Sequence, residues 1–222
     1  MTFRTRWGLL IALLVVFTLT MLLAGQRAQP PPVTGVERLG PDSGELVADY
    51  LQRAAGSFPP PGGGEVWGLV QLGDYLDPAA AAQEMRGARL SSVVLRVPLP
   101  GVQTALIFQD LPGQHPAVEL AGAMRAAAQE RAQAAGQAPP GSRRAAVATA
   151  EAARLRAGCT CVLAVLVRAD GAVLRDLASR VGVRAVQAAH PGTPREDVAV
   201  SPLLPEQRDT VGPVSDEGPV PP

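Results

Sequence analysis

The sequence predicts an α+β domain that a single N-terminal transmembrane helix holds outside the cytoplasm. An uninterrupted apolar run extends from Trp7 to Gly25. Two later segments, Val66–Gly101 and Cys161–Gly192, each follow the pattern of a strand, an Asp-led helix and a second strand. Two such β-α-β-like units are expected to build a ferredoxin-like or related sheet, with helices on one face and a helical insertion between the units.

The apolar run has the length of a membrane-spanning helix, because a helix rises about 1.5 Å per residue and the hydrocarbon core is roughly 30 Å thick. Arg4 and Arg6 precede the run, and no acidic residue occurs before Glu37. The positive-inside rule therefore predicts that residues 1–6 stay in the cytoplasm and that the C-terminus is extracytoplasmic. We expect a single-pass protein of the cell membrane, in contact with the lipid bilayer.

Cleavage of this segment as a signal peptide is the alternative. A cut after Ala24 or Gly25 would place a leucine at position −3, and a cut after Ala28 would place Gln26 there. Signal peptidase sites carry small residues at that position. Residues 7–25 are therefore predicted to remain as an uncleaved anchor.

Composition limits the functional classes. All 20 basic residues are arginine and the chain contains no asparagine, a composition typical of a GC-rich bacterial genome. Without Arg4 and Arg6, 18 arginines face 20 acidic residues, so the extracytoplasmic part carries a net charge of −2. Nucleic-acid-binding proteins present a basic surface, so we expect no nucleic-acid partner.

Residues 26–64 are predicted to form a proline- and glycine-rich stalk with one short helix. Pro30-Pro31-Pro32 stiffens its start, and residues 59–64 break the chain at its end. Asp42 and Glu45 have the spacing of a capping box. The apolar residues that follow fall on one helical face: Leu46, Val47, Tyr50, Leu51 and Ala54.

The extracytoplasmic domain is expected to span residues 65–190. Short apolar runs rich in strand formers predict strands at 66–72, 93–99, 102–108, 160–167 and 183–188. Pro100-Gly101 suits a type II turn, so the second and third strands should form an antiparallel hairpin. Pro98 implies that its strand lies at an edge or ends there. The nearly continuous apolar run at 160–167 is typical of a central strand covered on both faces.

Four helices are predicted in this domain from their start signals. A capping side chain or a proline at the first helical position marks each start. The signals are Asp77-Pro78, His115-Pro116, Ser142 and Asp170. They predict helices at about residues 78–86, 116–135, 143–158 and 171–180.

Residues 191–222 are predicted to be a disordered acidic tail. This segment has 8 prolines and 6 acidic residues in 32 positions, with no hydrophobic periodicity. Such a composition cannot bury enough apolar surface to offset the entropy of ordering the chain.

Cys159 and Cys161 are the only cysteines and the main candidates for chemistry. On an extended strand their Cα atoms would lie about 6.5 Å apart on the same face, near the limit for a disulfide. Three roles stay open: a structural disulfide or thiol pair, a redox-active dithiol, and part of a soft-metal site. Neither His115 nor His190 is expected near the thiols, so no cofactor or metal is assigned.

Hydrolytic sites are not indicated. No serine lies in a Gly-x-Ser-x-Gly elbow. The pair Asp74/Asp77 is better interpreted as a loop and a helix cap, and Glu196/Asp197 falls in the predicted tail. Residues 62–64 are glycines, but they precede a strand rather than a helix, which is the wrong context for a phosphate loop.

These patterns favour a non-catalytic envelope module over an enzyme. The anchor and stalk would hold an interaction or assembly domain that contacts another envelope protein. The alternative is an envelope thiol-redox or soft-metal-handling protein that uses Cys159 and Cys161. No motif in the sequence identifies a named family.

Overall fold

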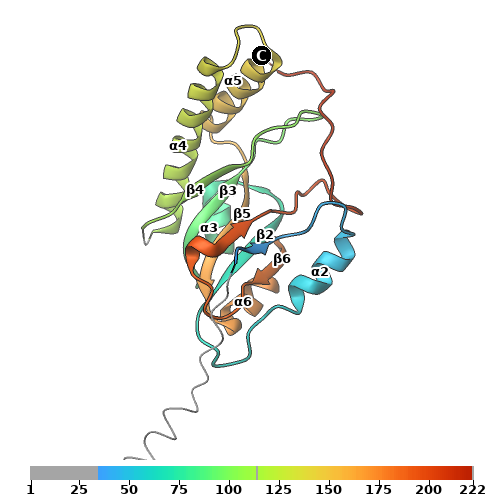
Figure 1. The fold of residues 1–222 in the computed structure, drawn as a ribbon. Helices are drawn as coiled ribbons and strands as arrows, with labels where there is room; N and C mark the ends of the chain where they lie inside the picture. Colours follow the sequence, from blue (N-terminus) through green and yellow to red (C-terminus); the bar gives the residue numbers. More distant parts are fainter. Residues whose placement is uncertain (1–34, 114, 222) are drawn as a thin grey trace, which may run out of the picture. The chain divides into compact units, whose positions relative to one another are not determined.

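The computed structural model describes residues 35–113 and 115–221. The chain divides into two units, Met1–Pro32 and Val33–Pro222, and all described residues belong to the second. Its elements are drawn in Figure 1 and follow in chain order: β1 Glu37–Leu39, α2 Val47–Ala55, β2 Val66–Leu76, α3 Pro78–Glu84, β3 Arg89–Leu95, β4 Ile107–Asp110, α4 Pro116–Gln137, α5 Arg143–Arg156, β5 Val162–Ala169, α6 Gly171–Ala178, β6 Val183–Ala188, the 3₁₀ turn Arg195–Asp197 and β7 Val198–Val200.

Five of the strands form one antiparallel sheet in the order β4-β3-β5-β2-β6. The expected mixed α+β class is therefore confirmed. Strand β5 is antiparallel to both β2 and β3 and lies between them, so β2 and β3 run in the same direction. By the same logic β5 and β6 run in the same direction on either side of β2. The strands of β2-α3-β3 and β5-α6-β6 thus interleave in one sheet.

Side-chain caps start three of the helices where the sequence places them. The Asp77 carboxylate accepts hydrogen bonds from the N–H groups of Ala79 and Ala80 at 2.8 and 2.9 Å. Asp170 caps α6 in the same way, and the Ser142 hydroxyl accepts one bond at the start of α5. These bonds satisfy N–H groups that lack a partner in the first helical turn.

The predicted hairpin strands are shorter than expected. Strands β3 and β4 pair only between Ser92–Leu95 and Ile107–Asp110, and residues 96–106 form a long connection. Pro98 and Pro100 have no N–H to donate to a strand ladder, which explains why β3 ends before them. Pro100-Gly101 forms the predicted turn: Val102 N–H donates to the Leu99 carbonyl at 3.1 Å, and Gly101 has φ +65°.

The sheet has two buried faces that different parts of the chain cover. Helices α3, α4 and α6 pack on one face around Val70, Val93 and Val165, and α5 packs against α4. On the other face, Leu69, Val94 and Leu163 are covered by β1, by β7 and by residues that follow β7. Helix α2 packs on the same second face against β6. Burial on both sides explains the nearly continuous apolar sequence of β5, as predicted.

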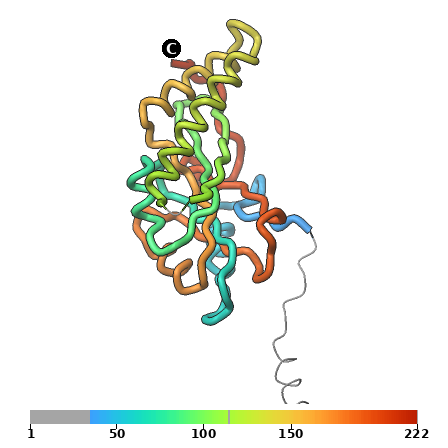
Figure 2. Tube along the Cα trace, turned by 90° about the vertical axis from the view of Figure 1, so that its left-hand side faces the viewer, coloured from blue at the N-terminus to red at the C-terminus, as the bar shows by residue number. Residues whose placement is uncertain are grey.

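The N- and C-terminal segments lie side by side on the second face. Strands β1 and β7 pair in parallel, with Glu37 opposite Val198 and Leu39 opposite Val200. Figure 2 shows this pairing as adjacent blue and orange-red segments. Leu46 forms a further bridge to Thr210. The two segments therefore stabilise each other as well as the sheet.

The predicted disordered tail is wrong for residues 198–211. Val198, Leu203 and Leu204 are buried, and β7 is a strand in this segment. Composition did not predict this order because the segment does not build its own core. Instead, its few apolar side chains enter an apolar surface that the sheet already provides.

The predicted stalk is also part of the domain from residue 35 onward. Leu39, Val47 and Tyr50 are buried, and the predicted short helix is present as α2. The Glu45 carboxylate accepts a hydrogen bond from Asp42 N–H at 2.8 Å, as in a capping box, although the helix itself begins later, at Val47. Among the described residues no helix is long and apolar enough to cross a membrane. The predicted anchor at 7–25 lies outside those residues.

Two buried glutamines fasten the terminal segments to the sheet. The Gln71 amide donates to the Tyr50 hydroxyl and accepts from Leu203 N–H. Gln187 accepts from Gly40 N–H at 2.7 Å. These bonds satisfy polar groups that would otherwise be buried without partners.

We predict that Gln71→Leu lowers the free energy of unfolding by about 2–4 kcal/mol, because it leaves Leu203 N–H and the Tyr50 hydroxyl buried without a partner. Gln83→Leu, at an exposed position of α3, is the matched control and should change this value by less than about 0.5 kcal/mol. Chemical denaturation followed by circular dichroism measures both. Equal effects of the two substitutions would contradict the fastening role of Gln71.

Candidate functional site

Cys159 and Cys161 form a disulfide between α5 and β5. Their Cα atoms are 5.4 Å apart, closer than the strand-based expectation, because both residues precede β5 and the chain bends at Thr160. The preceding helix ends in a Schellman motif: Gly158 N–H donates to the Leu155 carbonyl and Cys159 N–H to the Arg154 carbonyl. Gly158 adopts φ +79°, which glycine tolerates best.

Cys161 joins the disulfide to the end of the sheet. Its N–H donates to the Leu76 carbonyl at 3.0 Å, and its carbonyl accepts from Arg96 N–H at 2.9 Å. Cys161 is fully buried, whereas Cys159 is partly exposed. The disulfide therefore links the C-terminal end of α5 to Cys161, the residue before β5, which is hydrogen-bonded to the neighbouring chain segments on both sides.

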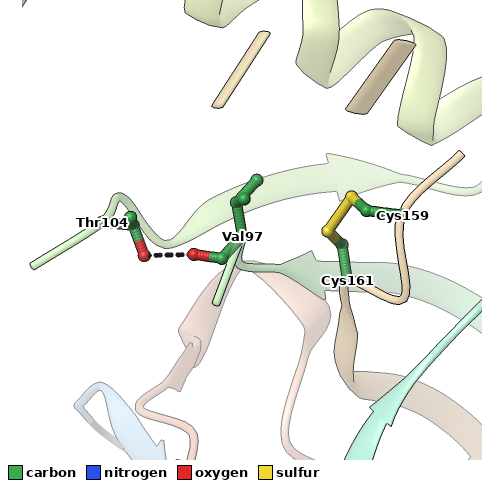
Figure 3. The surroundings of a disulfide bond; sticks show 4 residues. All are labelled: Val97, Thr104, Cys159 and Cys161. Carbon is green, nitrogen blue, oxygen red and sulfur yellow. Dashed lines mark hydrogen bonds between the residues drawn. A yellow bond between two sulfur atoms is a disulfide. The ribbon is translucent and has the colours of Figure 1, made fainter. Parts of the chain in front are cut away.

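The connection of residues 97–106, called here the 97–106 loop, lies beside the disulfide. Thr104 closes this loop by donating its hydroxyl to the Val97 carbonyl at 2.7 Å (Figure 3). Val97 and both cysteines belong to the same packed cluster. Ala105 N–H donates to the Glu151 carboxylate of α5 at 2.6 Å, so the loop is also bound to the helical pair.

Glu151 is a buried charge with a complete set of partners. Its side chain is fully buried, and its second oxygen accepts from Arg131 Nε of α4 at 2.7 Å. A buried carboxylate is stable only when it is paired and hydrogen-bonded. This ion pair therefore fixes α4, α5 and the loop relative to one another.

Arg96 is the second buried charge at this end of the sheet. Its side chain is 2% exposed, and it donates to Glu206 at 2.7 Å and to the Tyr75 hydroxyl. The Tyr75 hydroxyl in turn lies 3.1 Å from both Glu206 carboxylate oxygens. Burial lowers the pKa of Arg96, but its contacts with Tyr75 and Glu206 outweigh that effect and raise the pKa above its ordinary value. The guanidinium therefore stays charged, and Glu206 neutralises it.

Two open cavities flank the 97–106 loop. The first, about 320 Å³, is lined by Arg96, Glu206, Ser215 and apolar loop residues. The second, about 440 Å³, is lined by Gln103, Thr104, Ala105, Arg131, Arg143, Arg144, Val147 and Asp216. Figure 1 shows the red C-terminal segment passing from β7 along this loop toward α5. Each cavity thus contains an arginine whose acidic partner comes from the C-terminal segment.

The histidines and paired carboxylates that the sequence analysis considered do not lie at the disulfide. His190 binds Glu37 of β1 at 2.7 Å through its ring nitrogen, and His115 is the residue that precedes α4. In residues 35–113 and 115–221, no group of three or more His, Cys, Asp or Glu side chains is placed to hold a metal ion. Asp77 is a helix cap, as interpreted from the sequence.

Sequence reasoning missed the buried charges. Arg96 stands alone in the apolar stretch Val93–Leu99, and Glu151 stands in an alanine-rich helix. A single charge within an otherwise apolar run is the available signal, because burying it requires a partner. Neither partner, Glu206 or Arg131, is adjacent in sequence, so the pairing itself was not predictable.

Comparisons with known proteins identify no family for this chain. No family model matches it, and neither the curated proteins nor the solved structures include a match. Its function must therefore be inferred from the domain itself.

The two tyrosines give a test of this packing. Burial raises the pKa of Tyr75 to about 12, and it also raises the pKa of Tyr50 above its ordinary value of 10.0. The folded state binds the phenolic protons of the two tyrosines more tightly than the unfolded state does. The resulting stabilisation of the fold is complete below pH 10 and is lost as pH rises from 10 toward 12. Absorbance near 295 nm should show little tyrosinate at pH 10.5 in the folded protein and about three-quarters ionisation in denaturant. Equal ionisation in both states would contradict the burial of these side chains.

We also predict that Glu206→Gln lowers the free energy of unfolding by about 1–2 kcal/mol, because it leaves the buried Arg96 charge without a counterion. Glu217→Gln, an exposed position of the same segment, is the control and should have an effect below about 0.5 kcal/mol. Chemical denaturation at pH 7 compares them. An unchanged stability of the Glu206 variant would show that Arg96 does not depend on this carboxylate.

Proposed function

We propose that the chain is a single-pass bacterial envelope protein whose extracytoplasmic domain binds another envelope protein without catalysis. Residues 7–25 would anchor it, and residues 26–34 would link the anchor to the domain. The interleaved strand order of the two β-α-β units fits a ferredoxin-like arrangement, to which β4 and the α4–α5 pair are additions.

The observation that carries this proposal is the surface around the 97–106 loop. Arginine-lined cavities flank the loop. Two apolar residues beside them are exposed: Leu106, the last residue of the loop, at 41%, and Phe108 at 51%. Phe108 lies on β4, an edge strand of the sheet. Arginine and aromatic residues are enriched at protein interfaces, and edge strands accept added strands. These features support a protein-binding surface.

Site-specific photocrosslinking in native membranes tests this role. A photoreactive phenylalanine analogue at Phe108 should yield a defined crosslinked product that contains a second protein. The same analogue at Val118, which is 65% exposed near the start of α4, is the matched control and should not yield that product. Equal labelling at both positions, or none at either, would contradict binding through this surface.

The membrane topology is tested separately. Alkaline phosphatase fused after Pro222 should be active in intact cells, because it requires an oxidising extracytoplasmic compartment. A fusion after Arg6 is the control and should be inactive. Activity of the control alone would invert the proposed topology.

A thiol-redox role is the second candidate function, and the partial exposure of Cys159 favours it. An external thiolate could attack the Cys159 sulfur, form a mixed disulfide and release the Cys161 thiolate. Alkylation of the native protein should label no cysteine before reduction and both afterwards. If the double variant Cys159→Ser/Cys161→Ser retains the Phe108 crosslink and the cellular phenotype, the redox role fails and the disulfide is structural.

A further inference from the structure

Residues 213–218 pass the two cavities beside the 97–106 loop and contribute little to the core. Residues 213–218 form no helix or strand, and none of them is buried. Hydrogen bonds and one ion pair hold residues 216–218, and Val214 packs against the apolar cluster on the second face. This distinguishes them from residues 198–204, whose leucines and valine enter the second face of the sheet.

Asp216 is bound as a carboxylate ligand would be. One of its oxygens accepts from Gln103 N–H and from Arg143, both at 3.0 Å. Arg143 also donates to the carbonyls of Asp216 and Gly218, each at 2.9 Å. The hydrogen bond from Arg143 lowers the pKa of Asp216, so the carboxylate is charged at neutral pH. The contacts thus recognise one carboxylate and the main chain around it.

Gly218 adds a steric requirement to this recognition. Its N–H donates to the Gly101 carbonyl at 2.6 Å. A Cβ atom at Gly218 would lie 2.5 Å from the Pro100 carbonyl oxygen and 2.8 Å from Gly101 main-chain atoms. Only glycine fits this approach without movement of the loop. The groove therefore fits an acidic residue followed two positions later by glycine.

The groove has positive charge and open volume that residues 213–218 do not fill. Arg131 and Arg144 line the same cavity of about 440 Å³, and Arg144 forms no ion pair with the described residues. Arg131 is paired with Glu151 and Arg143 with Asp216, so among the described residues Arg144 supplies the unpaired positive charge of the groove. This excess of positive charge complements a peptide more acidic than the segment itself.

We propose that residues 213–218 occupy a peptide-binding groove as an internal substitute for a partner. The groove lies between the 97–106 loop and the start of α5, and its ligand is an extended acidic segment of another protein with the pattern acidic-x-Gly. This assignment rests on the proposed role as a binding module and names the chemistry of its partner. The tethered segment competes at an effective concentration in the millimolar range, so a partner must displace it.

Peptide binding to the full chain in detergent micelles tests the groove. The probe is a fluorescent synthetic peptide with the sequence of residues 211–222, and anisotropy measures its affinity. A variant that ends at Gly212 should bind it at least tenfold more tightly than the complete chain, because the competing segment is gone. Arg143→Gln in the shortened variant should abolish binding, whereas Arg125→Gln, an exposed arginine of α4 outside the groove, should not.

Modified peptides and a second variant complete the test. Peptides that carry Asp216→Asn or Gly218→Ala should bind the shortened variant at least tenfold more weakly. If the shortened variant does not fold, as judged by its thermal transition, the full chain with Asp216→Asn should still bind the unmodified probe several-fold more tightly than the wild-type chain. Equal affinity of the wild-type chain and a folded variant, or of the modified and unmodified peptides, would overturn the proposal.

Two further outcomes separate the alternatives. If the complete chain dimerises and the shortened variant does not, the segment binds a second copy, and the proposal fails. If peptide binding fails but the Phe108 crosslink persists, only the groove assignment is lost. If the peptide binds as expected but no crosslink forms, the groove stands and the role of the β4 surface is wrong.

Discussion

The constraint on which this fold depends is the second apolar face of its five-stranded sheet. Helices cover the first face, but no helix of the β-α-β units reaches the other. The N- and C-terminal segments must cover it, since exposed Leu69, Val94 and Leu163 would lose their contribution to stability. Gln71 and Gln187 bind those segments through buried hydrogen bonds. The apolar side chains of the segments are therefore buried while their main-chain N–H groups keep hydrogen-bond partners.

This covering brings the disulfide, the Arg96–Glu206 pair and the C-terminal segment to one end of the sheet. The hydrogen bond from Arg96 N–H to the Cys161 carbonyl joins the disulfide on one side to the Arg96–Glu206 pair on the other. The C-terminal segment supplies Glu206, continues past the loop and ends beside α5. A change in the position of the segment would therefore alter both cavities without unfolding the sheet. Residues 213–218 suit such a change because polar contacts supply most of their binding, with Val214 packed against the second face.

The sequence predicted the local elements better than the long-range contacts. Asp77, Ser142 and Asp170 act within three residues, so their capping roles were readable from sequence. The turn at Gly101 was predicted for the same reason. The ordered structure of residues 198–211 was not predicted, because it depends on an apolar surface that β2, β3 and β5 form only in the folded chain. The pairing of Arg96 with Glu206 has the same origin: each residue was visible, but only the folded chain brings them together.

Hydrogen exchange of the full-length protein tests most directly whether the C-terminal segment is an integral layer of the domain. Ser201 N–H donates to the Leu39 carbonyl, and Leu203 N–H donates to Gln71, so both amides should exchange at least a hundredfold more slowly than unprotected amides. Amides of residues 214–217 should exchange much faster than these two. Unprotected exchange throughout residues 198–211 would contradict the account, because the second face of the sheet would then lack its cover.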